Sequence, residues 1–270
     1  MPAIEFSRLR TKIELLGRVY HQPEQFVKDL QYLYFFYSDL TFQTGKSNAA
    51  NVNALQTYRT PLIINRELER LLRPRAMADP EDTLKIIDLL WQTKFLEPCQ
   101  LAASLLGDLP IDQVGAVLER IQNWSLSGEK TELLEMLHSK ATEAIRREAP
   151  GLWINTLRVW VSSNDPTLQK FGVLGLVPML NEPDFNNLPM IFDFLQPIIA
   201  ATDPHLAVTL LSLIEQLAQK SEPETVYFLK QIIRDSNKSD LPRFIRRAMP
   251  SFSEQAQLSL KNCLRENPIP

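Results

Sequence analysis

Residues 79–106 read DPEDTLKIIDLLWQTKFLEPCQLAASLL, and this stretch decides the fold. An Asp-Pro pair suits a helix start, because Asp can accept from the free N–H groups of the first turn and Pro lacks a donor that would be unpaired there. Apolar residues then recur at helical spacing in two runs. The runs are Leu84, Ile87, Leu90, Trp91 and Phe95, and then Leu101, Ala102, Leu105 and Leu106. We therefore predict two consecutive antiparallel helices joined by a short break.

The same start signal recurs at Asp165-Pro166, Asp203-Pro204 and Ser221-Glu222-Pro223-Glu224. Asp165 and Asp203 are 38 residues apart, and Asp79 and Asp165 are 86 apart, which is two units of about 43. This spacing is typical of HEAT and armadillo repeats, each too small to bury its apolar face alone. The sequence thus predicts an all-α superhelical solenoid of antiparallel helix pairs of the HEAT or armadillo kind. Two final helices, at about 241–249 and 253–265, are expected to cap it.

The N-terminal part differs from the repeats. One helix is expected at about 4–20 and a second at about 23–40, and the second is dense in aromatic residues. Residues 41–60 are polar and rich in Asn, Ser and Thr, so we expect a long loop there. The predicted organisation is a helical hairpin over 1–40, a polar loop over 41–60, and one continuous, elongated repeat array over 61–270.

Composition agrees with helices joined at proline-marked corners, because the 270 residues include 19 prolines and only 8 glycines. No apolar run approaches the roughly 20 residues of a membrane span, so we expect a cytoplasmic monomer that does not enter a membrane. Cys99 and Cys263 are far apart and are expected to be ordinary thiols. The net charge is −3, but residues 1–78 hold eleven Lys or Arg against seven Asp or Glu. That basic end is where charge indicates a polyanionic partner.

Two groups of arginines are candidates for contacts with phosphate. The first group shares one helix face: Arg66, Arg70 and Arg73. Its alternative interpretation is a solvated face with intrahelical ion pairs. The second group lies on the penultimate helix: Arg243, Arg246 and Arg247. A terminal repeat needs a polar outer face, which is a structural reason for charge at that position.

Tryptophan is the candidate for stacking on a nucleic-acid base. Trp124 stands at a helix end beside a polar break over 125–130, where its ring can face a concave surface. Trp153 and Trp160 are seven residues apart, and we expect both in one buried stripe.

The histidines share no metal-ligand spacing with one another or with a cysteine, so we interpret them as polar surface residues. They are His21, His138 and His205. No P-loop, dinucleotide-binding or nucleophile-elbow signature occurs in the chain. We therefore predict no metal and no cofactor.

Three stretches carry a family resemblance: 89–109 (LLWQTKFLEPCQLAASLLGDL), 121–134 (IQNWSLSGEKTELL) and 152–180 (LWINTLRVWVSSNDPTLQKFGVLGLVPML). A helix pair, an isolated Trp, and then W-x-x-S before a new helix follow one another in that order. Over about the middle third of the chain, this order resembles the central repeats of the HEAT-like DNA alkylation repair family of alkylpurine DNA glycosylases. The resemblance implies a HEAT-repeat fold and contact with DNA through its concave face.

In that family the Trp is followed four residues later by an Asp that supports cleavage of the glycosidic bond. Trp124 matches the Trp, but the fourth position after it is Gly128, and Glu129 substitutes only if the register slips. The family's paired arginines, which hold the DNA backbone, correspond to Gln169 and Lys170 here. Because a carboxylate is needed to stabilise the developing oxocarbenium ion, the resemblance leaves enzymatic activity open. It implies DNA contact by Trp124 and Lys170.

The sequence is compatible with two functions. The first is a divergent alkylation-repair-like protein that binds DNA through Lys170 and the arginines of the penultimate helix. The second is a non-enzymatic scaffold, in which the solenoid groove or the aromatic N-terminal hairpin binds another protein. A metal- or cofactor-dependent enzyme ranks below both.

Overall fold

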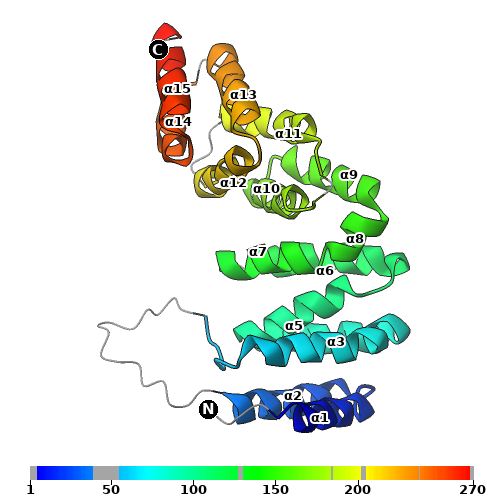
Figure 1. Cartoon of the computed structure of the whole chain (residues 1–270). Helices are drawn as coiled ribbons and strands as arrows, with labels where there is room; N and C mark the ends of the chain where they lie inside the picture. Colours follow the sequence, from blue (N-terminus) through cyan, green and yellow to red (C-terminus); the bar gives the residue numbers. More distant parts are fainter. Residues whose placement is uncertain are drawn as a thin grey trace. The chain divides into compact units, whose positions relative to one another are not determined.

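The computed structural model describes residues 5–38, 55–126, 130–183, 185–201, 205–236 and 238–267. Within these ranges the chain forms fifteen α-helices and two 3₁₀ helices, with one isolated bridge between Gln56 and Phe95 and no strand (Figure 1). The predicted all-α fold of neighbouring, repeated helices is confirmed. Two compact units divide the chain, Met1–Ala149 (unit 1) and Pro150–Pro270 (unit 2).

Unit 1 arranges its helices in two layers. One layer contains, in order, α1 (Phe6–Arg18), α3 (Leu62–Ala78), α5 (Leu96–Gly107) and α7 (Thr131–Lys140). The other contains α2 (Pro23–Tyr37), α4 (Pro80–Gln92) and α6 (Val114–Leu126). A 3₁₀ turn, Ile111–Gln113, leads into α6, and the short α8 (Glu143–Glu148) follows α7. Each helix therefore packs on a helix of the next pair, which is the pattern of a repeat array.

Unit 2 repeats this pattern. Its first layer contains α9 (Pro150–Val161), α11 (Leu188–Ala201), α13 (Glu222–Asp235) and α15 (Glu254–Glu266). Its second layer contains α10 (Pro166–Leu180), α12 (Ala207–Lys220) and α14 (Leu241–Ala248), and the 3₁₀ turn Met249–Ser251 follows α14. The two expected terminal helices correspond to α14 and α15.

Proline marks helix starts as the sequence predicts. Helices α4 and α10 begin at Pro80 and Pro166, and Pro223 stands in the first turn of α13. The predicted side-chain cap is confirmed at Asp165, whose carboxylate accepts a hydrogen bond from the N–H of Thr167 at 2.8 Å. The fixed φ of proline suits the first helical turn at each of these sites.

The predicted caps at Asp79 and Ser221 are wrong, because neither side chain accepts from its helix. At Asp79 the main-chain carbonyl is used, and it accepts from the hydroxyl of Thr83 at 2.8 Å. At Ser221 the hydroxyl donates to the carboxylate of Glu224 at 3.2 Å. The expected start at 203–204 lies outside the described residues.

The interior is filled by the apolar faces of both layers. Trp153 and Trp160 are buried as predicted, with their rings edge to face at 5.7 Å. His138 is also fully buried, so its interpretation as a surface residue is wrong. It shares the inward face of α7 with Leu134 and Leu137, and burial lowers the pKa of its imidazole to about 3.

The predicted polar loop is described only from residue 55 onward. This part is held against α5 by the buried carboxylate of Glu97, which accepts from the Thr57 hydroxyl at 2.6 Å and from the Tyr58 N–H at 3.0 Å. The boundary between the compact units falls inside the predicted 61–270 array, and α1 and α2 belong to unit 1. The domain boundaries drawn from the sequence stay predictions.

Among the described helices, no single one has both the length and the apolar character needed to cross a bilayer. The segments Leu96–Gly107 and Ile111–Leu126 reach that threshold only when they are joined, and they are bent by 110°.

The close approach of α5 and α7 at Gly107 generates a prediction. A Cβ atom at this position would lie 2.1 Å from the carbonyl oxygen of Lys140, so Gly107→Ala must separate the ends of α5 and α7. We expect a loss of about 1–3 kcal/mol in the free energy of unfolding, measured by urea denaturation. Gly115→Ala in α6 is the matched control, because a Cβ there meets nothing within 4 Å. Equal stability of the two variants would contradict the close approach.

Candidate functional site

The predicted arginine face of α3 borders a charged groove in unit 1. Arg66, Arg70 and Arg73 are all exposed on this face. The groove has a volume of about 320 Å³, and side chains from α5, α7 and α8 form its other sides. They are Ser104, Asp108, Lys140 and Glu143. The arginines share the groove because their i, i+4, i+7 spacing places them on one side of the helix.

Two of these arginines form ion pairs with carboxylates. The Arg70 guanidinium lies 2.9 Å from the carboxylate of Glu67, which Arg10 of α1 also approaches at 3.4 Å. The hydrogen bond from Arg70 holds the pKa of Glu67 below its usual value. Arg73 pairs with Asp108 across the helices at 2.8 Å. The predicted intrahelical ion pair is therefore found at Arg70, whereas Arg73 pairs with a carboxylate outside α3.

One carboxylate that lines the groove joins three helices. Glu69 of α3 accepts from the Ser104 hydroxyl of α5 at 2.7 Å and lies 3.9 Å from the Lys140 ammonium of α7. Arg66 is the lining cation for which no ion pair is found among the described residues. The lining of the groove thus holds four cations and three carboxylates, so its charge is nearly balanced. The cations are Arg66, Arg70, Arg73 and Lys140, and the carboxylates are Glu69, Asp108 and Glu143.

Among the residues that line this groove, Asp108 has a pKa well above its ordinary value. Burial raises its pKa to about 6, and the Arg73 guanidinium lowers it only partly because that side chain is half exposed. Sequence reasoning did not place Asp108 and Lys140 beside these arginines, because Asp108 follows α5 and Lys140 ends α7. The one local signal was Gly107, which lets the end of α5 approach α7 closely enough to bring Asp108 and Lys140 together.

The expected stacking role of Trp124 is not supported. Its side chain is 8% exposed, and its ring stacks on Trp91 of α4 at 4.4 Å with an angle of 7° between the planes. The indole therefore fills the contact between α4 and α6 and offers little ring surface to a base. Gly128 and Glu129, the positions tied to catalysis by the family resemblance, lie outside the described residues.

The other predicted DNA contacts belong to unit 2. Lys170 is half-buried on α10. The arginines Arg243, Arg246 and Arg247 are exposed on α14, and α12 lies between α10 and α14 in their layer. These cations remain candidates for phosphate contacts.

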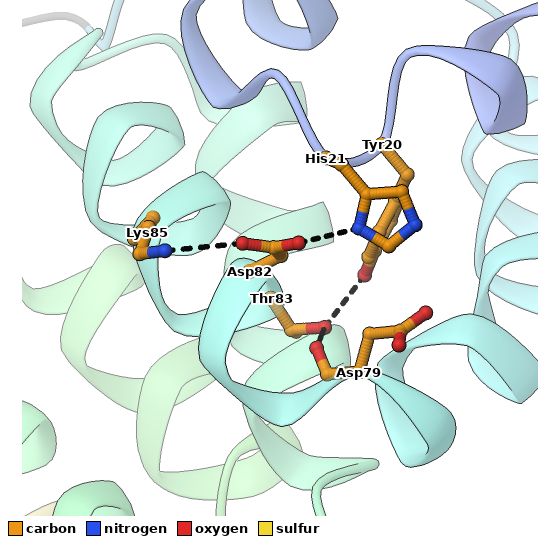
Figure 2. Close-up of polar contacts among 6 residues, drawn as sticks. All are labelled: Tyr20, His21, Asp79, Asp82, Thr83 and Lys85. Carbon is orange, nitrogen blue, oxygen red and sulfur yellow. Dashed lines mark hydrogen bonds and ion pairs between the residues drawn. The ribbon is translucent and has the colours of Figure 1, made fainter.

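A histidine–aspartate pair lies where the α1–α2 turn meets α4. His21 Nδ1 lies 2.6 Å from the Asp82 carboxylate, which also pairs with Lys85 at 3.1 Å (Figure 2). The hydrogen bond with His21 is the main cause of the lowered pKa of Asp82. Both His21 and Lys85 are exposed. An exposed pair of this kind contributes little to stability.

The hydroxyl groups beside this pair are structural. Thr83 donates to the Asp79 carbonyl, so its one hydroxyl hydrogen is used and Tyr20 must be the donor in their 2.7 Å hydrogen bond (Figure 2). Tyr20 and Thr83 are both fully buried, and burial raises the pKa of Tyr20 to about 12. The hydrogen bond between the Tyr20 and Thr83 hydroxyls joins the α1–α2 turn to α4, and neither hydroxyl is positioned to act as a nucleophile.

The outer helices of unit 1 expose an aromatic surface, which we call the hairpin face. It comprises Leu15, Tyr32, Phe35 and Phe36, which are between 40% and 63% exposed. A groove of about 390 Å³ runs between α1 and α2 beside Leu15, Tyr32 and Phe36. Two cations of α1 lie over the Phe36 ring, the Arg8 guanidinium at 5.2 Å and the Lys12 ammonium at 4.4 Å from its centre. The hairpin face is therefore apolar, and its border carries the cations Arg8 and Lys12 and the carboxylate of Asp29.

Comparison of the chain with protein-family models, curated proteins and solved structures gives no match. The resemblance to the DNA alkylation repair family stays a prediction from the sequence. Among the described residues, no group of three or more His, Cys, Asp or Glu side chains is placed to hold a metal ion.

The raised pKa of Asp108 predicts a pH-dependent stability. A carboxyl with a pKa of about 6 in the folded protein and 3.8 when unfolded takes up a proton on folding between these values. Its contribution is therefore fully present below pH 4 and is lost as the pH rises through 6. Asp108→Asn removes this loss, so the variant should gain about 1–3 kcal/mol relative to wild type between pH 4 and pH 7.

Urea denaturation at several pH values measures this gain, and Asp112→Asn, at an exposed position just beyond α5, is the control. Parallel stability curves for wild type and Asp108→Asn would show that Asp108 titrates as an ordinary exposed carboxyl.

Proposed function

We propose that this protein is a non-enzymatic helical-repeat scaffold that binds another protein through the hairpin face of unit 1. The observation that carries the proposal is the exposure of Tyr32, Phe35 and Phe36 on one side of α2. Among the described helices, α1 and α2 begin their layers, and the described helices leave these three rings exposed. A cluster of exposed aromatic rings at that position is what a partner surface would cover.

The composition of the hairpin face supports a protein as the partner. Aromatic side chains bury large areas at low conformational cost, and they dominate the binding energy of protein interfaces. Arg8 and Lys12 border the rings, which suits an interface with a charged rim around an apolar centre. The groove beside Leu15 and Tyr32 adds a concave surface for a partner side chain.

Three side chains that could act as an acid or a base are bonded to other side chains, which supports a function without catalysis. His21 is bonded to Asp82 at the surface, and Asp108 is bonded to Arg73. The Tyr20 hydroxyl donates inside the fold, and burial raises its pKa. His21, Asp108 and Tyr20 therefore each have a structural partner.

DNA binding is the second candidate, and one specific observation favours it. Arg243, Arg246 and Arg247 are exposed on α14, and no carboxylate pairs with them among the described residues. Guanidinium groups on one short helix can contact neighbouring phosphates. The net charge of −3 and the buried position of Trp124 weigh against this candidate.

A photo-crosslinking amino acid at Tyr32 of the full chain tests the scaffold proposal in the cell that makes the protein. We expect one discrete protein adduct, reduced about tenfold by Phe35→Ser combined with Phe36→Ser. The same crosslinker at Glu119, which is exposed on α6, is the matched control and should give no such adduct.

Duplex DNA titrated into the purified protein separates the two candidates. Two results together would overturn the scaffold proposal. The first is that the crosslinker at Tyr32 gives no adduct. The second is that duplex DNA binds with an affinity that falls steeply as salt is raised and that is lost in the triple variant Arg243→Gln, Arg246→Gln, Arg247→Gln.

A further inference from the structure

A second apolar groove lies in unit 2, where α11 and α13 are neighbours in their layer (Figure 1). Its volume is about 450 Å³, which is enough for one or two large side chains. Phe192 of α11 and Phe228 of α13 form the floor, with their rings stacked at 4.5 Å and 16°. Tyr227 stands at the border and is 64% exposed. The groove is thus a preformed aromatic site, built without any residue of the hairpin face.

Two prolines restrict the backbone at the helix starts that line this groove. Pro189 lies in the first turn of α11 and Pro223 in the first turn of α13, and both line the groove. Proline in a first turn keeps the backbone fixed without losing a hydrogen bond. A ligand therefore meets a site that needs little ordering, which favours affinity.

The border of the groove is negatively charged. Asp193 of α11 and Glu224 of α13 line it, and none of its lining residues is a cation. Both carboxylates are exposed, and among the described residues neither is paired with a Lys or Arg. The amide side chains of Gln196 and Gln231 are the other polar lining groups, and each can donate and accept hydrogen bonds.

We propose that this groove binds a linear segment of a partner protein in which an aromatic or branched aliphatic residue is flanked by Lys or Arg. The apolar residue inserts against Phe192, Phe228 and Tyr227, and the flanking cations pair with Asp193 and Glu224. The charge of the border decides this choice, because carboxylates without cations repel an acidic segment and attract a basic one. Gln196 and Gln231 bond the polar backbone groups that the segment brings into the groove. The hairpin face plays no part in this proposal.

The experiment is selection of a displayed library of random linear peptides on the full-length protein, with the Tyr227→Ala protein used to remove peptides that bind elsewhere. We expect the surviving peptides to share a large apolar residue with Lys or Arg beside it. Their affinity, measured by fluorescence anisotropy, should fall about tenfold in Tyr227→Ala and also in Asp193→Lys. It should also weaken as salt is raised, because the flanking charges face exposed carboxylates.

Matched controls distinguish a lost contact from a damaged fold. Leu258→Ala replaces an exposed residue of α15, and Glu215→Lys reverses an exposed charge of α12 outside the groove. Both should bind the peptides as the wild type does, and all four variants should unfold at the same urea concentration.

Three results would overturn the proposal. The first is that no peptide depends on Tyr227, and the second is that the shared pattern is acidic or has no cation. The third is concentration-dependent self-association, seen by light scattering and lost in Asp193→Lys, which would assign the groove to a second copy of this chain.

Discussion

None of the described helices buries its apolar face alone, and the mutual coverage of neighbouring helices is the constraint on which the structure depends. Helix α5 shows it most clearly, because ten of its twelve residues are buried. It packs against α3 and α7 in its own layer and against α4 and α8. A helix covered from so many sides transmits any displacement to its neighbours, since well-packed interiors leave no space to absorb it. The charged groove of unit 1 is assembled around the end of this helix.

The same constraint explains where apolar residues stay exposed. A helix inside a layer has a neighbour on either side, whereas α1 and α2 begin their layers, so part of their surface lacks a described helix beside it. Tyr32, Phe35 and Phe36 lie on such a surface. In unit 2 the exposed aromatic residue Tyr227 lies at the junction of α11 and α13, where the two neighbouring helices leave a groove. The first surface has both cations and a carboxylate at its border, whereas the charged residues that line the second are all acidic, so the two surfaces suit different partners.

The sequence pattern predicted the fold well, because helical periodicity and proline-marked starts are local properties. Apolar residues at helical spacing correctly placed α4 and α5, and the cap at Asp165 follows from its own side chain. Trp124 and His138 were misplaced, because periodicity shows which residues share a face but not which helix covers that face. Trp124 is buried by Trp91, a residue 33 positions earlier in the chain.

The candidate surfaces were predicted only in part. Aromatic density in the N-terminal hairpin and the arginine spacing on α3 are visible in the sequence. The pairing of Arg73 with Asp108 and the groove beneath Tyr227 are not, because each joins residues of different helices. Such sites come from the geometry of stacking and have no local motif.

Hydrogen exchange of the full chain, measured by mass spectrometry, tests the mutual dependence of the helices most directly. Leu105 of α5 is fully buried, and Leu105→Ala removes apolar contacts worth about 2–5 kcal/mol. If neighbouring helices stabilise one another, amide protection will fall in α3, α4 and α7 together with α5, and less in α1, which packs on α2 and α3. Loss of protection confined to α5 would show that each helix is stable by itself, and it would contradict the account.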